Sequence, residues 1–128
     1  THCISSAASD VYKRQALLVV AGLIGASGVA LAAAGAHTAA ANLATAATFL
    51  LIHAVAVTAI ALHGGGALFS LAATLLACGA CMFAGDLAVR AWGATRLFPM
   101  AAPTGGLGMI AGWLCLSVAA LAGALTRP

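Results

Sequence analysis

The stretch ALLVVAGLIGASGVALAAAGA, residues 16–36, contains no charged side chain. About 20 apolar residues in an α-helix cross the hydrocarbon core of a bilayer, which is about 30 Å thick, because each residue adds about 1.5 Å. Strands are disfavoured, since the strands of a membrane barrel alternate between apolar and polar residues and this stretch is apolar throughout. Residues 16–36 therefore predict a transmembrane helix.

Three further apolar runs follow, at residues 44–62, 67–85 and 104–125. The first two connectors, 37–43 and 63–66, are short, so we expect neighbouring helices to be antiparallel. Gly64, Gly65 and Gly66 should end the second helix, because consecutive glycines are poor helix formers. Pro99 and Pro103 prevent the last connector from forming one helix, and Pro103 is expected just before the fourth run. The sequence predicts an all-α integral membrane bundle of four transmembrane helices.

The composition of the whole chain supports this class. Of its 128 residues, 64% are hydrophobic and 5% are charged, whereas a soluble domain carries about 25% charged residues. So few charges cannot cover the surface of a domain in water, and they exclude a soluble enzyme, a disordered chain and a nucleic-acid binder. The expected partner is the lipid bilayer, and no nucleic acid and no cofactor are expected.

Residues 1–15 differ from the rest of the chain. The run SSAASDVYKRQ, residues 5–15, matches in every residue the in-frame translation of a transposase sequencing adapter. We therefore expect residues 1–15 to be a non-native leader without stable contacts to the helices, and residues 16–128 to be the single domain. A signal peptide, a basic surface anchor and a natural polar tail are the alternatives.

Without that leader, few charges remain to set the orientation in the membrane. Asp86, Arg90, Arg96 and Arg127 are the charged residues of 16–128. Arg90 and Arg96 favour a cytoplasmic last connector, whereas Arg127 favours the opposite orientation, so the charges leave both orientations open.

Small residues in the helices predict tight packing between them. Lipid tails are as apolar as leucine, so transmembrane helices associate by close contact of small side chains. Gly25, Gly28 and Gly35 are the candidates in the first helix, and Gly108 and Gly112 form a GxxxG motif in the fourth. This pattern favours close helix contacts over a wide aqueous pore.

His53 lies near the middle of the second run, where a polar group is costly and usually has a partner inside the bundle. It is either a proton relay or ligand contact, or a neutral imidazole hydrogen-bonded to a backbone carbonyl or to a hydroxyl of Thr48, Thr58 or Ser70. His37 and His63 are expected at helix ends, in contact with water or lipid headgroups.

Cys78 and Cys81 have CxxC spacing, but the residues around them are apolar. A redox pair needs a cation or a helix start nearby, and a zinc site needs two more ligands, so we expect the cysteines to serve in packing.

Asp86 and Arg90 are four residues apart and would share one face of a continuing helix. They predict an ion pair at the membrane edge, or alternatively a carboxylate that faces a solute or proton pathway. With one acid in residues 16–128, most hydrolytic mechanisms lack their groups, and no catalytic set is apparent.

Several stretches together resemble a bacterial membrane family, the domain of unknown function 423. The segment from Gly25 to His37 is similar to its G-A-x-G-V-A-L-G-A-F-G-A-H motif, and FLLIHA, residues 49–54, to its Y-Q-L-x-H-A motif. FAG at 83–85 and AAPTGG at 101–106, followed by Gly112 and Trp113, resemble its F-S-G and I-T-P-I-G-G…G-W segments.

The chain departs from the family's pattern at several positions. Ala32 and Ala34 replace Gly and Phe, Phe49 replaces Tyr, and Asp86 stands where Ser is common. The resemblance implies a small inner-membrane protein with four helices and implies no reaction. It places His37 and His53 at motif positions.

Two functions are compatible with the sequence. The first is a structural or binding module that associates with itself or with another membrane protein. The second is a small transporter of a solute or of protons that uses His53, with or without Asp86. An intramembrane enzyme is disfavoured, because the chain has few reactive groups. We expect a binding or structural role.

Overall fold

A computed structural model describes residues 1–126, and four helices account for most of them. They are α1 (His2–Thr38), α2 (Ala41–His63), α3 (Ala67–Ala91) and α4 (Ala101–Thr126). Each is long and apolar enough to cross a membrane, which confirms the predicted all-α membrane fold. Arg127, which bore on the orientation, lies outside the described residues.

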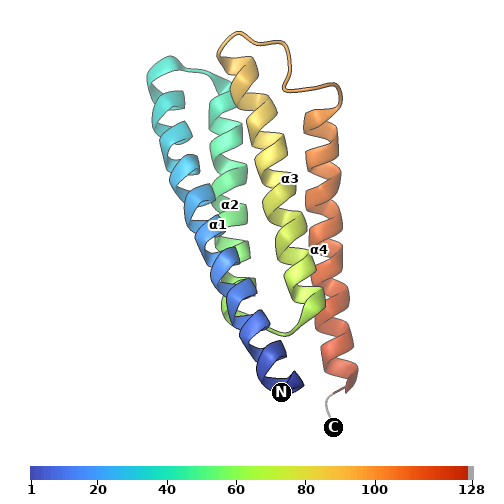
Figure 1. Cartoon of the computed structure of the whole chain (residues 1–128). Helices are drawn as coiled ribbons and strands as arrows, with labels where there is room; N and C mark the ends of the chain where they lie inside the picture. The colour runs from blue at the N-terminus through green and yellow to red at the C-terminus, as the bar shows by residue number, and fades with distance from the viewer. Residues whose placement is uncertain (127–128) are drawn as a thin grey trace.

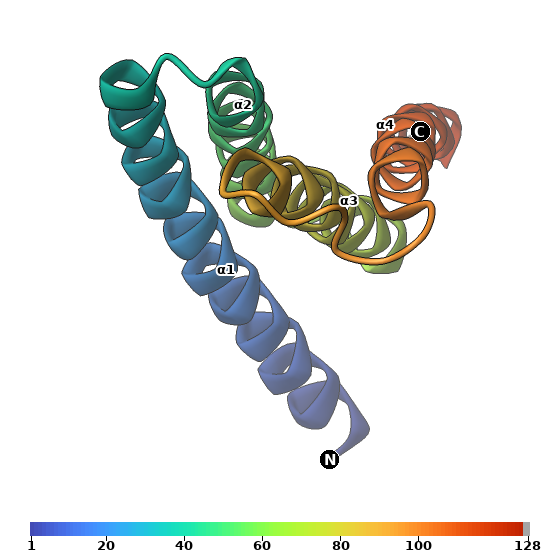
Figure 2. The ribbon, with the colours of Figure 1, turned by 90° about the horizontal axis from the view of Figure 1, so that it is seen from above.

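The helices are antiparallel along the chain (Figure 1). The α1–α2 and α3–α4 connections lie at one end, and the α2–α3 connection lies at the other end with the start of α1 and the end of α4. Seen along the helices, the four form a curved row in chain order (Figure 2). α1 packs on α2 and also touches α3, whereas α4 approaches α3 alone at backbone distance among the described residues.

The position in this row decides what each helix buries. The two central helices, α2 and α3, contribute most of the buried apolar side chains, among them Leu43, Val57 and Leu76. The outer helices, α1 and α4, bury few residues and expose large apolar ones such as Leu114. Such exposed apolar faces suit a lipid environment, where no hydrophobic force drives them inward.

The helices extend beyond the predicted spans. α1 has 37 residues, which is about 55 Å of helix and nearly twice the thickness of a hydrocarbon core. Residues 1–15 form its first turns, and the expectation that they make no contact is wrong at Arg14. Nε and Nη2 of Arg14 donate to the carbonyl oxygens of Ala61 and Leu62 at 3.0 and 3.1 Å. The last carbonyls of a helix lack donors from their own helix and attract a cation, which explains the contact.

We expect deletion of residues 1–15 to leave the four-helix fold intact. The hydrogen bonds that are lost to other helices are the two from Arg14 to the end of α2, so the free energy of unfolding should fall by about 1–3 kcal/mol. Thermal unfolding in detergent, followed by circular dichroism, measures this change. Collapse of the helical signal in the shortened chain would contradict the prediction and would show that the segment is part of the folded domain.

Both predicted helix breaks are present, with one difference at Pro103. Gly64, Gly65 and Gly66 have φ values of 78°, 87° and 89°, a region that side-chain-bearing residues rarely adopt, and α2 ends there as predicted. Pro103 lies inside the first turn of α4, two residues after its start at Ala101. Proline is tolerated there because the first N–H groups of a helix have no partner within the helix.

A close backbone contact joins α3 to α4 at Gly79 and Gly105. A Cβ atom on Gly105 would lie 2.6 Å from the backbone nitrogen of Phe83 and 2.7 Å from the carbonyl oxygen of Gly79. One on Gly79 would lie 2.7 Å from the backbone nitrogen of Met109. The sequence pattern missed both glycines, although a side chain at either position would collide with the backbone of the other helix.

The glycines that the sequence analysis named differ in how much space surrounds them. A Cβ on Gly28 would lie 2.8 Å from Cγ of Leu51, and one on Gly112 would lie 2.8 Å from the side chain of Leu76. For the other three, the nearest atoms would be at 3.3 Å for Gly35, 3.4 Å for Gly108 and 3.6 Å for Gly25. Gly25 therefore has room for a side-chain methyl group, whereas Gly28 and Gly112 do not.

Candidate functional site

His53 is buried at the middle of α2, where 4% of its surface is exposed. Nδ1 lies 2.7 Å from the carbonyl oxygen of Phe49, one turn earlier in α2. Nε2 accepts a hydrogen bond from Nε1 of Trp113 in α4 at 3.3 Å. This hydrogen bond between side chains joins α2 to α4, although the backbones of these two helices are not in contact.

The partners of His53 define its protonation. An indole nitrogen is a donor only, so Nε2 must accept and carries no proton. A carbonyl oxygen is an acceptor only, so Nδ1 must carry the proton and donate to Phe49. The ring is therefore neutral, with one hydrogen-bond partner at each nitrogen. Of the expected partners, the backbone carbonyl is correct and the hydroxyls of Thr48, Thr58 and Ser70 are not, since the two ring nitrogens bond to Phe49 and Trp113.

Aromatic rings pack around this bridge. The rings of Phe49 and His53 are nearly parallel, with their centroids 6.0 Å apart. Phe83 from α3 lies against Phe49 at 4.6 Å, and the ring of Trp113 meets His53 edge-on at 6.0 Å. Side chains from three helices thus fix the orientation of the imidazole.

A second polar site lies near the C-terminal end of α3, where Asp86 is fully buried. Its Oδ2 atom pairs with Nη2 of Arg90 one turn later, as the spacing predicted. Its Oδ1 atom accepts a hydrogen bond from the backbone nitrogen of Leu97 at 2.8 Å. Because Leu97 belongs to the α3–α4 connection, the carboxylate ties that connection to the end of α3.

Comparison with known proteins assigns the family. A family described as "Protein of unknown function (DUF423)" matches residues 30–106, which is more than half of the chain. The chain belongs to the DUF423 family. Neither a curated protein nor a solved structure matches it significantly.

The DUF423 match contains some of the candidate residues and not others. His37, His53, Asp86 and Arg90 lie within residues 30–106, whereas Trp113 lies beyond them. The bridge between α2 and α4 therefore joins a residue inside the matched region to one outside it.

The cysteines of this DUF423 chain are free thiols. Cys78 and Cys81 are exposed, so the expectation that they are small side chains buried in packing is wrong. It is Gly79, between them in the sequence, that contacts α4. Cys115 donates a hydrogen bond from its thiol to the carbonyl oxygen of Leu68 at 3.5 Å. Residues 1–126 contain no group of three His, Cys, Asp or Glu side chains that could hold a metal ion.

The other two histidines of residues 16–128 lie at helix ends, as expected. His37 is exposed in the last turn of α1, and His63 is the last residue of α2. They lie at opposite ends of the molecule because α1 and α2 are antiparallel (Figure 1). The structure therefore brings none of His37, His53 and His63 together.

Proposed function

We propose that this DUF423 protein is a binding or structural module of the bacterial inner membrane, which associates with a second copy or with another membrane protein. The observation that carries this proposal is the closed hydrogen bonding of His53. A proton relay needs a ring nitrogen that can exchange its proton with a neighbouring group or with water. Both nitrogens of His53 are engaged by fixed partners instead.

The exposed apolar faces of the two outer helices are the surfaces open to association. On α4 these faces carry large side chains, each at least 40% exposed: Leu107, Ile110, Trp113, Leu114, Val118, Leu121 and Leu125. Large apolar side chains alone give no driving force in lipid, so association requires a partner helix that packs closely enough to replace lipid there. The inner membrane fits helices of this kind, because bacterial outer-membrane proteins are barrels.

The transporter alternative requires His53 to leave this arrangement. To carry a proton, the imidazole would have to give up the bond from Trp113 or the bond to Phe49, and a hydrated path would have to reach it. Asp86 has both carboxylate oxygens occupied, by Arg90 and by Leu97. The arrangement of both residues supports a structural role over a transport role.

We expect His53→Leu to fold, to reach normal levels and to restore fully any growth phenotype of a strain that lacks the protein. Hydrogen bonds between membrane helices average about 0.6 kcal/mol and reach about 1.7 kcal/mol, so the loss of stability should be small. In vesicles with an internal pH dye, the parent protein and the variant should both leave proton flux at the level of protein-free vesicles.

Two outcomes would decide against the module. Proton flux through the parent that disappears in His53→Leu would establish the transporter. A folded variant that fails to restore growth would show that the imidazole itself is needed. Phe49→Leu, which removes the neighbouring ring and keeps the carbonyl, is the matched control for lost packing.

A further inference from the structure

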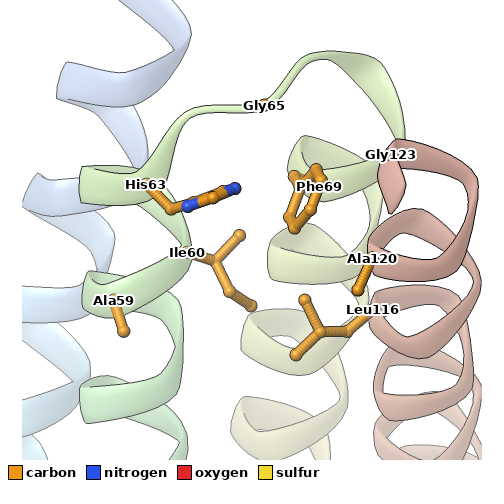
Figure 3. Close-up of a pocket in the computed structure, with 8 residues that line it drawn as sticks. All are labelled: Ala59, Ile60, His63, Gly65, Phe69, Leu116, Ala120 and Gly123. Atoms are coloured by element: carbon orange, nitrogen blue, oxygen red, sulfur yellow. The ribbon is translucent and has the colours of Figure 1, made fainter. Parts of the chain in front are cut away.

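An apolar cleft opens between α2 and α4 on the side of the α2–α3 connection (Figure 3). Its volume is about 420 Å³. Its lining comes from three helices and the connection: Ala59, Ile60, His63, Gly65, Phe69, Leu116, Ala120 and Gly123. The cleft exists because α4 packs its backbone on α3 alone, which leaves α2 and α4 apart over α3.

The cleft covers the outer part of one leaflet of a bilayer. Its outer end lies at His63 and Gly123, near the ends of α2 and α4. Its inner end lies at Ala59 and Leu116, short of the hydrogen bond that joins His53 to Trp113. Four residues of α2 and seven of α4 separate the two ends, which is about 6–10 Å and less than half of a hydrocarbon core of about 30 Å.

The width of the cleft excludes a helix and fits a single acyl chain. A volume of about 420 Å³ over about 10 Å leaves a cross-section about 6 Å wide, whereas a helix with side chains is about 10 Å wide. A methylene group is close in size to a water molecule, which takes about 30 Å³ in the liquid, so the volume of the cleft corresponds to about 14 such groups. A second copy of the chain cannot insert a helix there without moving α2 and α4 apart.

The outer end of the cleft offers a polar group at the level of lipid headgroups. The imidazole of His63 lies across from Phe69, with the ring centroids 4.7 Å apart (Figure 3). In any protonation state an imidazole has at least one N–H donor, which can bond to a phosphate or ester oxygen. The cleft thus combines a short apolar channel with a donor at its mouth.

We propose that this cleft, with His63 at its mouth and Ala59 and Leu116 at its inner end, holds the first part of one acyl chain of a phospholipid, with the phosphate group at His63. The phospholipid comes from the leaflet on the side of the α2–α3 connection. Every residue of the cleft lies outside residues 1–15. The proposal does not depend on the association proposed above, because the large apolar side chains exposed on α4 do not line the cleft.

The test is phospholipid retention, measured by native mass spectrometry. The whole chain is reconstituted in vesicles of phosphatidylethanolamine and phosphatidylglycerol and then released into mild detergent. We expect one phospholipid to stay bound per chain. Gly123→Phe should lower the retained fraction by about fivefold or more, the scale of one good contact inside the membrane. Gly123 lines the cleft and has open space where a Cβ would lie, so the ring can enter without a clash.

Gly106→Phe is the matched control, because Gly106 also has open space at its Cβ position but lies near the start of α4, away from the cleft. It should retain phospholipid like the parent. Ala120→Leu fills the cleft with a side chain smaller than Phe, and it replaces Gly123→Phe in the test if that variant does not fold. His63→Phe keeps a ring beside Phe69 and removes the donor, so it should lower retention by about threefold.

Three results would overturn the proposal. One is a parent chain that retains no phospholipid, and another is equal retention in the cleft-filling variants and in Gly106→Phe. The third is a parent chain that is a dimer without bound lipid, together with a Gly123→Phe variant that is a monomer. A second copy of the chain would then be the occupant of the cleft.

Discussion

Gly105→Leu is expected to separate α4 from α3 and to lower the free energy of unfolding by about 3 kcal/mol or more. A Cβ at this position would lie 2.6 Å from the nitrogen of Phe83 and 2.7 Å from the oxygen of Gly79, and both are backbone atoms that cannot turn aside. α4 has no other backbone neighbour among residues 1–126, so a shift of α4 loses most of its packing. Unfolding in detergent with increasing denaturant, followed by Trp fluorescence, measures the effect.

The neighbouring glycine provides the control for this substitution. Gly106 has no atom within 4 Å of its Cβ position, so Gly106→Leu changes the same helix by the same side chain without a clash. It should change the free energy of unfolding by less than about 0.5 kcal/mol. Equal stability of the two variants would show that α3 and α4 do not meet at Gly105.

The four helices could be predicted because each depends on the residues of its own segment. Each run is apolar along its whole length, and the breaks carry residues that end helices, such as Gly64 to Gly66. The end of α3 was harder to place. Its apolar run ends at Gly85, but the helix continues to Ala91, because the charge of Asp86 is neutralised within the same helix by Arg90. Residue spacing predicted this pair, whereas it could not predict the contact with Leu97.

The contacts between helices could not be predicted, because they depend on which faces meet. In a chain so rich in alanine and glycine, many positions have small residues four apart, and nothing distinguishes Gly105 from Gly106 in the sequence. The partner of His53 is Trp113, 60 residues away, and a sequence alone does not show that these side chains meet across α3. The single clue was the position of both residues near the middle of their predicted helices.

Removing the carboxylate of Asp86 is the second change with a large expected effect. In Asp86→Ala the cation of Arg90 loses its partner, and the backbone nitrogen of Leu97 loses its acceptor. Breaking a buried ion pair in this way costs about 3–5 kcal/mol. The Arg90 side chain is 29% exposed and can turn toward water, so we expect the lower end, about 3 kcal/mol. The same unfolding measurement in detergent gives the value.

Two further variants separate the ion pair from the hydrogen bond. Asp86→Asn keeps a side-chain oxygen for the nitrogen of Leu97 and removes the charge, so it should destabilise the protein less than Asp86→Ala. Combining Asp86→Ala with Arg90→Leu removes both charges and should recover part of the loss, because no unpaired cation remains. Asp10→Ala is the control, since Asp10 meets Lys13 at 4.0 Å in an exposed pair that contributes little. If Asp86→Ala were as stable as Asp10→Ala, the carboxylate would not hold the α3–α4 connection, and its burial would need another cause.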